Sequence, residues 1–212
     1  MTDSACCGDM ACFASQTPGF EVLPHLVRMI SKGSPITLQE LADEGSLPVA
    51  DLESMLRSQP GTDWDEAGRL VGFGLTLRPT THRFTVAGRV LYTFCATDAL
   101  LFTHILGEPA VAESVCPVTS QPIRIDLTPG AVVSIDPPDA VVSQILNPAL
   151  LGDLRHNICD QGHFFASADA ADGWMREHPE GQVLTVEEAF DRCRRDVEEL
   201  GWLPRSAQER AS

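Results

Sequence analysis

The sequence predicts an α+β protein, in which a three-helix, winged-helix-like unit precedes a mostly antiparallel sheet core flanked by helices. Between residues 20 and 58, apolar side chains recur at helical spacing in three segments that end near Gly or Pro. Between residues 110 and 146, short β-branched runs alternate with prolines, which is typical of an antiparallel meander. We therefore expect a Cys-rich flexible tail at 1–19, a winged-helix-like domain at 20–86 and an α+β domain at 87–212.

The three N-terminal helices have recognisable ends. The first begins near Phe20 and stops before Gly33, because glycine commonly follows the end of a helix. Thr37 and Glu40 have the spacing of a capping box, which predicts the start of the second helix. Pro48 suits the first turn of the third helix. The inward faces should be buried, and they carry Phe20, Leu26, Leu41, Leu52 and Leu56.

Strands are expected where β-branched and aromatic residues gather between turn residues. Residues 70–77 and 82–86 predict the wing that follows the three helices, and 89–94 suits a strand or a helix. Ser167 and Thr185 each have the character of a helix N-cap. The meander and one further strand are expected at 111–115, 123–127, 132–135 and 141–146.

The composition excludes several classes of protein. The 212 residues are 43% hydrophobic and 21% charged, as expected of a globular protein. The net charge of −15 repels phosphate backbones, so we expect no nucleic acid as a partner. No apolar run reaches the length of a membrane span, and the start lacks the basic and apolar regions of a secretory signal. We therefore expect no membrane partner and a cytoplasmic location.

The seven cysteines are an odd number without a C-x-x-C pair, which argues against a disulfide framework and a zinc finger. Catalysis, redox sensing and soft-metal binding remain as possible roles for these thiols. Cys6, Cys7 and Cys12 lie close together in the tail and are suitable ligands for a soft metal ion. The alternative is a flexible leader whose thiols have no specific role.

A thiol and a carboxylic acid lie three residues apart, at Cys95 and Asp98, between apolar flanks. If Thr97 caps a helix, the two side chains meet across its first turn. A thiolate is a nucleophile and a metal ligand, and the acid can transfer a proton. The alternative is a small buried cysteine beside a capping acid.

A second thiol, Cys159, precedes the run from His163 to Ser167, and with it the sequence resembles the organomercurial (alkylmercury) lyases of bacterial mercury resistance. The resemblance extends from about Phe20 to about Phe190. It depends on residues 72–77, on residues 91–100 with their C-x-x-D, and on Cys159 with the His-Phe-Phe-Ala-Ser run that follows it.

The resemblance implies that 87–212 is a catalytic domain that cleaves carbon–mercury bonds. Cys95 and Cys159 would bind the mercury of substrate and product, and Asp98, also near the mercury, would supply the proton to carbon. No cofactor is implied. Cellular thiols would release Hg(II), and mercuric reductase would accept it. Cys116 corresponds to a cysteine regarded as structural, and Phe94 stands where better-known members carry Trp.

Two other functions stay open at this point. A thiol-based heavy-metal sensor would bind DNA through the winged helix, but the third helix offers Asp51, Glu53 and a single Arg57. A soft-metal-binding protein without turnover would not need Asp98. His163 and Cys193 are expected to be a satisfied polar group and a helix-packing residue.

Overall fold

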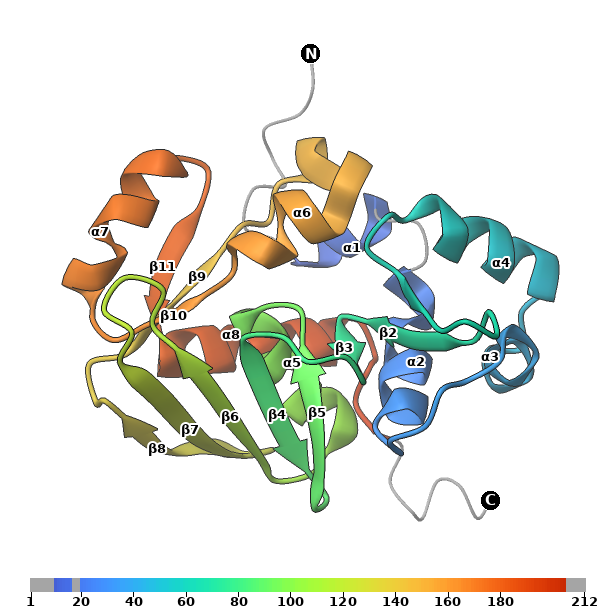
Figure 1. Cartoon of the computed structure of the whole chain (residues 1–212), viewed down its shortest axis with the longest axis horizontal. Coiled ribbons are helices and arrows are strands. Elements are labelled where there is room, and N and C mark those ends of the chain that lie inside the picture. The colour runs from blue at the N-terminus through green and yellow to red at the C-terminus, as the bar shows by residue number, and fades with distance from the viewer. Residues whose placement is uncertain (1–9, 17–19, 205–212) are drawn as a thin grey trace.

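The structure is a computed structural model that describes residues 10–16 and 20–204. The helices of residues 20–58 lie at one end of the molecule, and two sheets with their covering helices form the rest (Figure 1). Helices come first and a mostly antiparallel sheet follows, so the predicted α+β class is confirmed.

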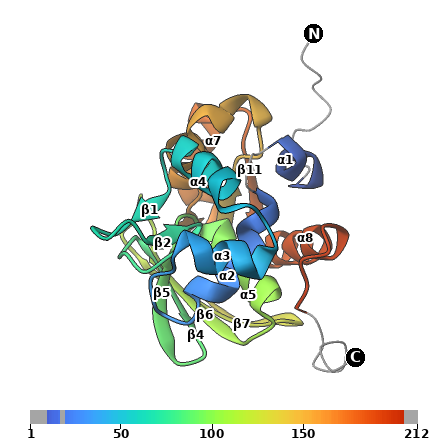
Figure 2. The same ribbon diagram turned by 90° about the vertical axis from the view of Figure 1, so that its right-hand side faces the viewer.

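Residues 20–58 form the helical unit that the sequence predicts (Figure 2). The expected capping box is present, because the backbone N–H of Glu40 donates to Thr37 Oγ1 at 3.2 Å and Thr37 N donates to Glu40 Oε2 at 2.7 Å. All five apolar residues expected to be buried are at most 8% exposed. The elements are η2 (Phe20–Val22), α2 (Leu23–Ile30), α3 (Leu38–Gly45) and α4 (Val49–Ser58).

The main sheet has eight antiparallel strands in the described part of the chain, in the order β1-β2-β3-β5-β4-β6-β7-β8. The expected boundary between 86 and 87 falls in the turn of the β4–β5 hairpin, so one sheet continues through it. The segment expected at 89–94 to be a strand or a helix forms a strand over residues 89–93. The strands are β1 (Asp63–Trp64), β2 (Leu70–Phe73), β3 (Leu75–Thr76), β4 (His82–Val86), β5 (Arg89–Thr93), β6 (Ala110–Val115), β7 (Pro122–Thr128) and β8 (Ala131–Asp136).

A smaller sheet has the order β10-β9-β11 among the described residues. The strand expected at 141–146 is its central strand and is not part of the meander, because it pairs with β10 and β11. The expected N-caps Ser167 and Thr185 are confirmed, each accepting a hydrogen bond from the helix that follows. The elements are β9 (Val141–Gln144), β10 (Phe164–Phe165), β11 (Gln182–Thr185), α7 (Ala168–Glu177) and α8 (Val186–Glu199).

Helix α5 (Ala96–Leu106) lies at the centre of the molecule. Nine of its residues are buried, so its surface is covered on all sides, by the main sheet, α8, α2 and β9. This packing fixes the start of α5 against several elements. The short segments η3 (Pro148–Asp153), α6 (Leu154–Asn157) and η4 (Cys159–Gln161) connect β9 to β10.

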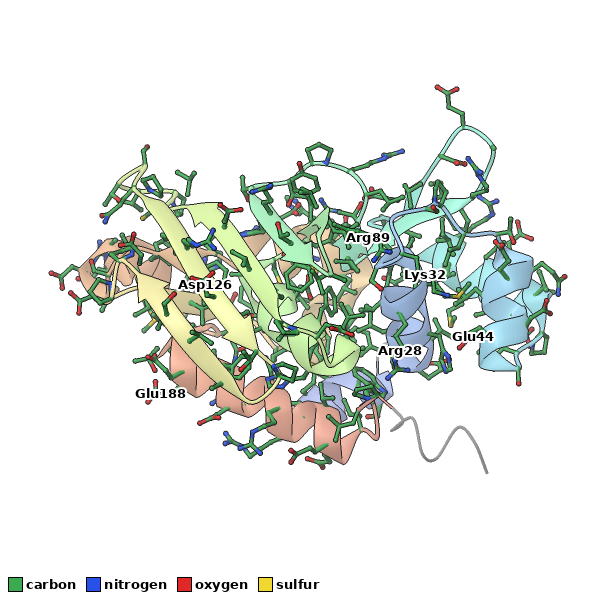
Figure 3. All side chains as sticks on the ribbon, turned by 90° about the horizontal axis from the view of Figure 1, so that it is seen from below. Arg28, Lys32, Glu44, Arg89, Asp126 and Glu188 are labelled. Atoms are coloured by element: carbon green, nitrogen blue, oxygen red, sulfur yellow. The ribbon has the colours of Figure 1, made fainter. Side chains whose placement is uncertain are left out.

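Charged side chains lie on the outer face of the main sheet, Asp126 among them (Figure 3). Arg124 donates to Asp126 at 2.6 Å, and Arg83 pairs with Glu113 on the neighbouring strand. The alternating burial of β6 and β7 places their apolar residues on the opposite face, against the helices. On α2, Arg28 donates from Nη2 to the carbonyl of Trp202 at 2.6 Å.

The expected flexible tail is wrong for residues 10–16, which form helix α1 (Met10–Gln16). Met10 and Phe13 are buried, and the Phe13 ring packs edge-on against Phe20 with centroids 5.6 Å apart. Two aromatic rings therefore anchor this helix to the core. Cys6, Cys7 and the side chain of Cys12 lie outside the described residues. No described helix combines the length and apolar character needed to cross a membrane.

Candidate active site

Cys95 and Asp98 cap the start of helix α5. The expected N-cap, Thr97, is wrong, because Cys95 itself occupies that position. The backbone N–H of Asp98 donates to Cys95 Sγ at 3.3 Å, and Cys95 N donates to Asp98 Oδ2 at 3.1 Å. This reciprocal pair is a capping box in which sulfur replaces the usual hydroxyl oxygen.

The structure places Cys159 beside Cys95, although 64 positions separate them in the sequence (159 − 95). The two thiols are hydrogen-bonded, and both line one cavity with Asp98. Cys159 lies at the start of η4, and it is more exposed than the buried Cys95. All three candidate site residues that the sequence predicts therefore lie together at one site.

Gly162 allows this close approach. Its carbonyl accepts a hydrogen bond from Ala96 N at 3.0 Å, so the end of η4 is joined to the start of α5. A Cβ at position 162 would lie 2.8 Å from Cys95 Cβ and 3.5 Å from its sulfur. Only glycine fits without moving one of the two segments.

His82 supports the same junction from strand β4. Its ring is 4% exposed, Nδ1 lies 3.0 Å from Ser114 Oγ, and it is also hydrogen-bonded to the backbone of Gly162. Burial lowers the pKa of His82 to about 3, so the ring is neutral at physiological pH. We interpret His82 as a structural support for Gly162.

The environment favours the protonated forms of the acid and of the buried thiol. Burial raises the pKa of Asp98 to about 6, against the opposing effects of its hydrogen bonds with Cys95 and the charge of Arg155. The hydrogen bond with Cys159, burial and the nearby Asp98 charge together raise the pKa of Cys95. A neutral Asp98 is able to donate a proton.

The cavity is partly open to solvent. Its wall is mostly apolar and receives side chains from the N-terminal helices as well as from the sheet domain. Phe94 forms part of it, with the Arg155 guanidinium 3.5 Å above its ring centre. Arg155 also pairs with Asp160, Nε to Oδ1 at 2.8 Å. Other apolar lining residues are Met10, Phe13, Phe20, Leu23, Phe73, Leu101, Ile145, Leu146, Leu154 and Ile158.

Three further residues considered from the sequence, Cys116, Cys193 and His163, lie outside this lining. Cys116 is buried just after strand β6. Cys193 packs on α8, where burial raises its pKa. His163 is partly buried, and burial lowers its pKa. Across residues 10–16 and 20–204, no group of three or more His, Cys, Asp and Glu is arranged to hold a metal ion.

Three residues at the site were not recognised from the sequence. Gly162, His82 and Arg155 have no motif of their own. Arg155 and Gly162 flank Cys159 in the sequence, and this closeness is the one local signal that could have identified them. A second glycine, Gly61, has the same kind of role as Gly162, since a Cβ there would lie 2.1 Å from Arg155 Cβ.

Comparisons with known proteins find the same family along most of the chain. The model of the alkylmercury lyase family matches residues 75–197, and that of the helix-turn-helix domain of alkylmercury lyase matches residues 14–74. The alkylmercury lyase of Bacillus cereus is 42% identical over 78% of this chain and 76% of its own length. That of Streptomyces lividans is 41% identical over 82% of this chain and 81% of its own length.

A solved structure has the same fold. The crystal structure of the mercury-bound form of MerB2 superposes with a TM-score of 0.74 and covers 90% of this chain and 96% of that one, at 22% identity. The two family models meet between residues 74 and 75, within the eight-stranded sheet.

Proposed function

This chain belongs to the alkylmercury lyase family, and from that premise we propose that it cleaves the carbon–mercury bond of organomercurials to a hydrocarbon and Hg(II). The observation that carries the proposal is the meeting of Cys95, Cys159 and Asp98 in one largely apolar cavity. Soft mercury prefers thiolate to oxygen and nitrogen ligands, and an apolar wall suits an organic group.

We propose that the two sulfurs bind mercury in succession. Each sulfur that bonds to mercury gives up its proton, one to the ligand that the first sulfur displaces and the other to Asp98. Two thiolates donate electron density to mercury and weaken its bond to carbon. The carbon–mercury bond then breaks, its electron pair remains on carbon, and the proton held by Asp98 is transferred there.

Asp98 suits this role because its carboxyl is held next to Cys95 by the capping hydrogen bonds. With a pKa of about 6, it accepts a proton from a thiol more readily than an ordinary aspartate and donates it again near neutral pH.

The product Hg(II) would remain on Cys95 and Cys159 until another thiol pair removes it. We propose cellular thiols as one acceptor and mercuric reductase as another, both in the cytoplasm. Mercury is then substrate and product, and the reaction needs no cofactor.

Helix α4 does not support the DNA-binding alternative. Its one basic residue, Arg57, pairs with Glu53 at 2.8 Å and lies over Trp64.

The direct test is to incubate the protein with phenylmercuric acetate and excess thiol, and to measure benzene by gas chromatography. We expect catalytic turnover, meaning many benzene molecules per protein molecule. Mercury binding without benzene would contradict the proposal and favour a soft-metal-binding protein. Binding of duplex DNA in physiological salt that responds to Hg(II) would favour the sensor.

A further inference from the structure

The cavity carries buried polar atoms that the proposed chemistry does not use. Within the described residues, six buried side-chain atoms lack a hydrogen-bond partner, and three of them belong to residues that line this cavity. They are Oε1 of Gln59, Oγ1 of Thr97 and Nε2 of Gln144, on side chains at most 8% exposed. Since a buried polar group without a partner costs free energy, this concentration in one cavity points to a polar ligand.

Two of these groups are hydrogen-bond donors. Gln144 Nε2 is an amide nitrogen, and the Thr97 hydroxyl can donate from its place between Cys95 and Asp98. The third, Oε1 of Gln59, belongs to an amide whose other end is a donor. A ligand that satisfies Thr97 and Gln144 together would supply acceptor atoms.

Arg155 adds a positive charge to the same wall. It is the one basic residue among the described residues that line the cavity. Its position is fixed by the Asp160 ion pair, by the Phe94 ring beneath it and by the backbone of Gly61 against its Cβ. The printed contact with Asp160 uses Nε, and the guanidinium has further N–H donors on its terminal nitrogens.

From these groups we propose that the cavity prefers organomercurials whose organic group carries a carboxylate. Arg155 would be its counter-ion, and Thr97 and Gln144 would be its neutral donors. The inference rests on the proposed function and specifies its substrate class. A carboxylate supplies acceptors for charged and neutral donors alike, and hydrogen bonds to a charged group are the stronger kind.

The test compares two arylmercury substrates of similar shape, 4-carboxyphenylmercury and 4-methylphenylmercury. The two substituents also change the reactivity of the ring carbon. The informative quantity is therefore the ratio of the two kcat/KM values, followed across variants. In Arg155→Gln we expect this ratio to fall on the order of tenfold or more, mainly through a higher KM for the carboxylate.

Arg57→Gln is the matched control, because Arg57 also pairs with a carboxylate and lies over an aromatic ring, but outside the cavity lining. It should leave the ratio unchanged. Thr97→Val and Gln144→Leu should each lower the ratio several-fold, and they provide the test if Arg155→Gln does not fold. Benzoate should also inhibit cleavage of the methyl substrate more strongly in the parent than in these variants.

An unchanged ratio in Arg155→Gln would overturn the inference, as would an equal fall in Arg57→Gln. If Arg155→Gln does not fold, unchanged ratios in both Thr97→Val and Gln144→Leu would overturn it. These outcomes are distinct from failure of the proposed function. A parent protein that cleaves the methyl substrate is a lyase whether or not it prefers carboxylates, whereas a parent that cleaves neither substrate refutes the proposed function itself.

Discussion

Asp98 and Cys95 exchange two hydrogen bonds at the first turn of α5, at 3.1 and 3.3 Å, so the proposed proton donor is fixed beside a proposed mercury ligand. Because the carboxylate and the thiol also cap the helix, a substitution at either residue alters local stability and chemistry together.

Asp98→Asn should bind organomercurial but cleave it far more slowly. The amide keeps the size and the capping acceptor of Asp98, yet it cannot deliver the proton, and a general acid contributes about 10²–10⁴ in rate. The measurements are mercury stoichiometry after desalting and hydrocarbon released per minute. Asp98→Ala should be similarly slow and lose about 1 kcal/mol of stability with the cap. Cleavage by Asp98→Asn at the parent rate would mean that Asp98 is only a cap.

The raised pKa of Asp98 predicts a pH dependence of stability. The folded pKa of about 6 lies above the ordinary aspartate value of 3.8, so the folded protein binds more protons than the unfolded chain between these values. This contribution to stability is present at low pH and is lost as the pH rises through 6. It amounts to about 1.4 kcal/mol between pH 5 and pH 8, the value of one pKa unit.

Urea unfolding of the parent and of Asp98→Asn at pH 5 and pH 8 checks this. The free energy of unfolding should fall less with pH in the variant. Asp126→Asn is the control, because Asp126 is an aspartate on the outer face of the sheet whose pKa is lowered by its hydrogen bond with Ser134. Equal pH dependence in the parent and in Asp98→Asn would contradict the raised pKa.

Cys95→Ala and Cys159→Ala should each fail to retain mercury after desalting, because each removes one of two sulfur ligands. Cys193→Ala should retain it, since that buried thiol on α8 does not line the cavity. The comparison is best made with Cys6, Cys7 and Cys12 replaced by Ser, so that N-terminal thiols do not bind the metal. Retention by a protein with only one of Cys95 and Cys159 would argue against shared coordination.

Gly162→Ala should lower the cleavage rate with a smaller effect on folding. The new methyl group meets Cys95 Cβ at 2.8 Å, so the end of η4 must move away from α5 and carry Cys159 with it. Overpacking of this kind costs about 1–3 kcal/mol. Gly130→Ala is a suitable control, because nothing lies within 4 Å of a Cβ at that position. Equal activity in both variants would show that the junction tolerates the shift.

Two parts of the N-terminal segment should differ in their importance for activity. Removing residues 1–9 should leave turnover with excess free thiol intact, because among the described residues the cavity lining begins at Met10. Removing residues 1–19 should impair activity or stability, since it removes Met10 and Phe13, which are buried and form part of the cavity wall. Truncations assayed with phenylmercuric acetate test this. Full activity without residues 1–19 would show that α1 is dispensable.

Several features of the fold were predictable because they depend on neighbouring residues. The capping boxes at Thr37 and Thr185, the cap at Ser167 and the meander arise from interactions within a few positions of the chain, and all are present. The buried faces of the N-terminal helices follow from helical spacing alone. The N-cap of α5 was misassigned to Thr97, because cysteine is not among the residues that usually fill this position.

The sequence by itself determined which chemical groups this protein possesses, namely two thiols and one acid of the right types. The tertiary structure decided what they can do together. The pairing of Cys95 with Cys159, the close approach of Gly162, the raised pKa of Asp98 and the position of Arg155 all depend on segments far apart in the chain. Burial and contact between such segments are properties of the packed molecule, and no local pattern of residues encodes them.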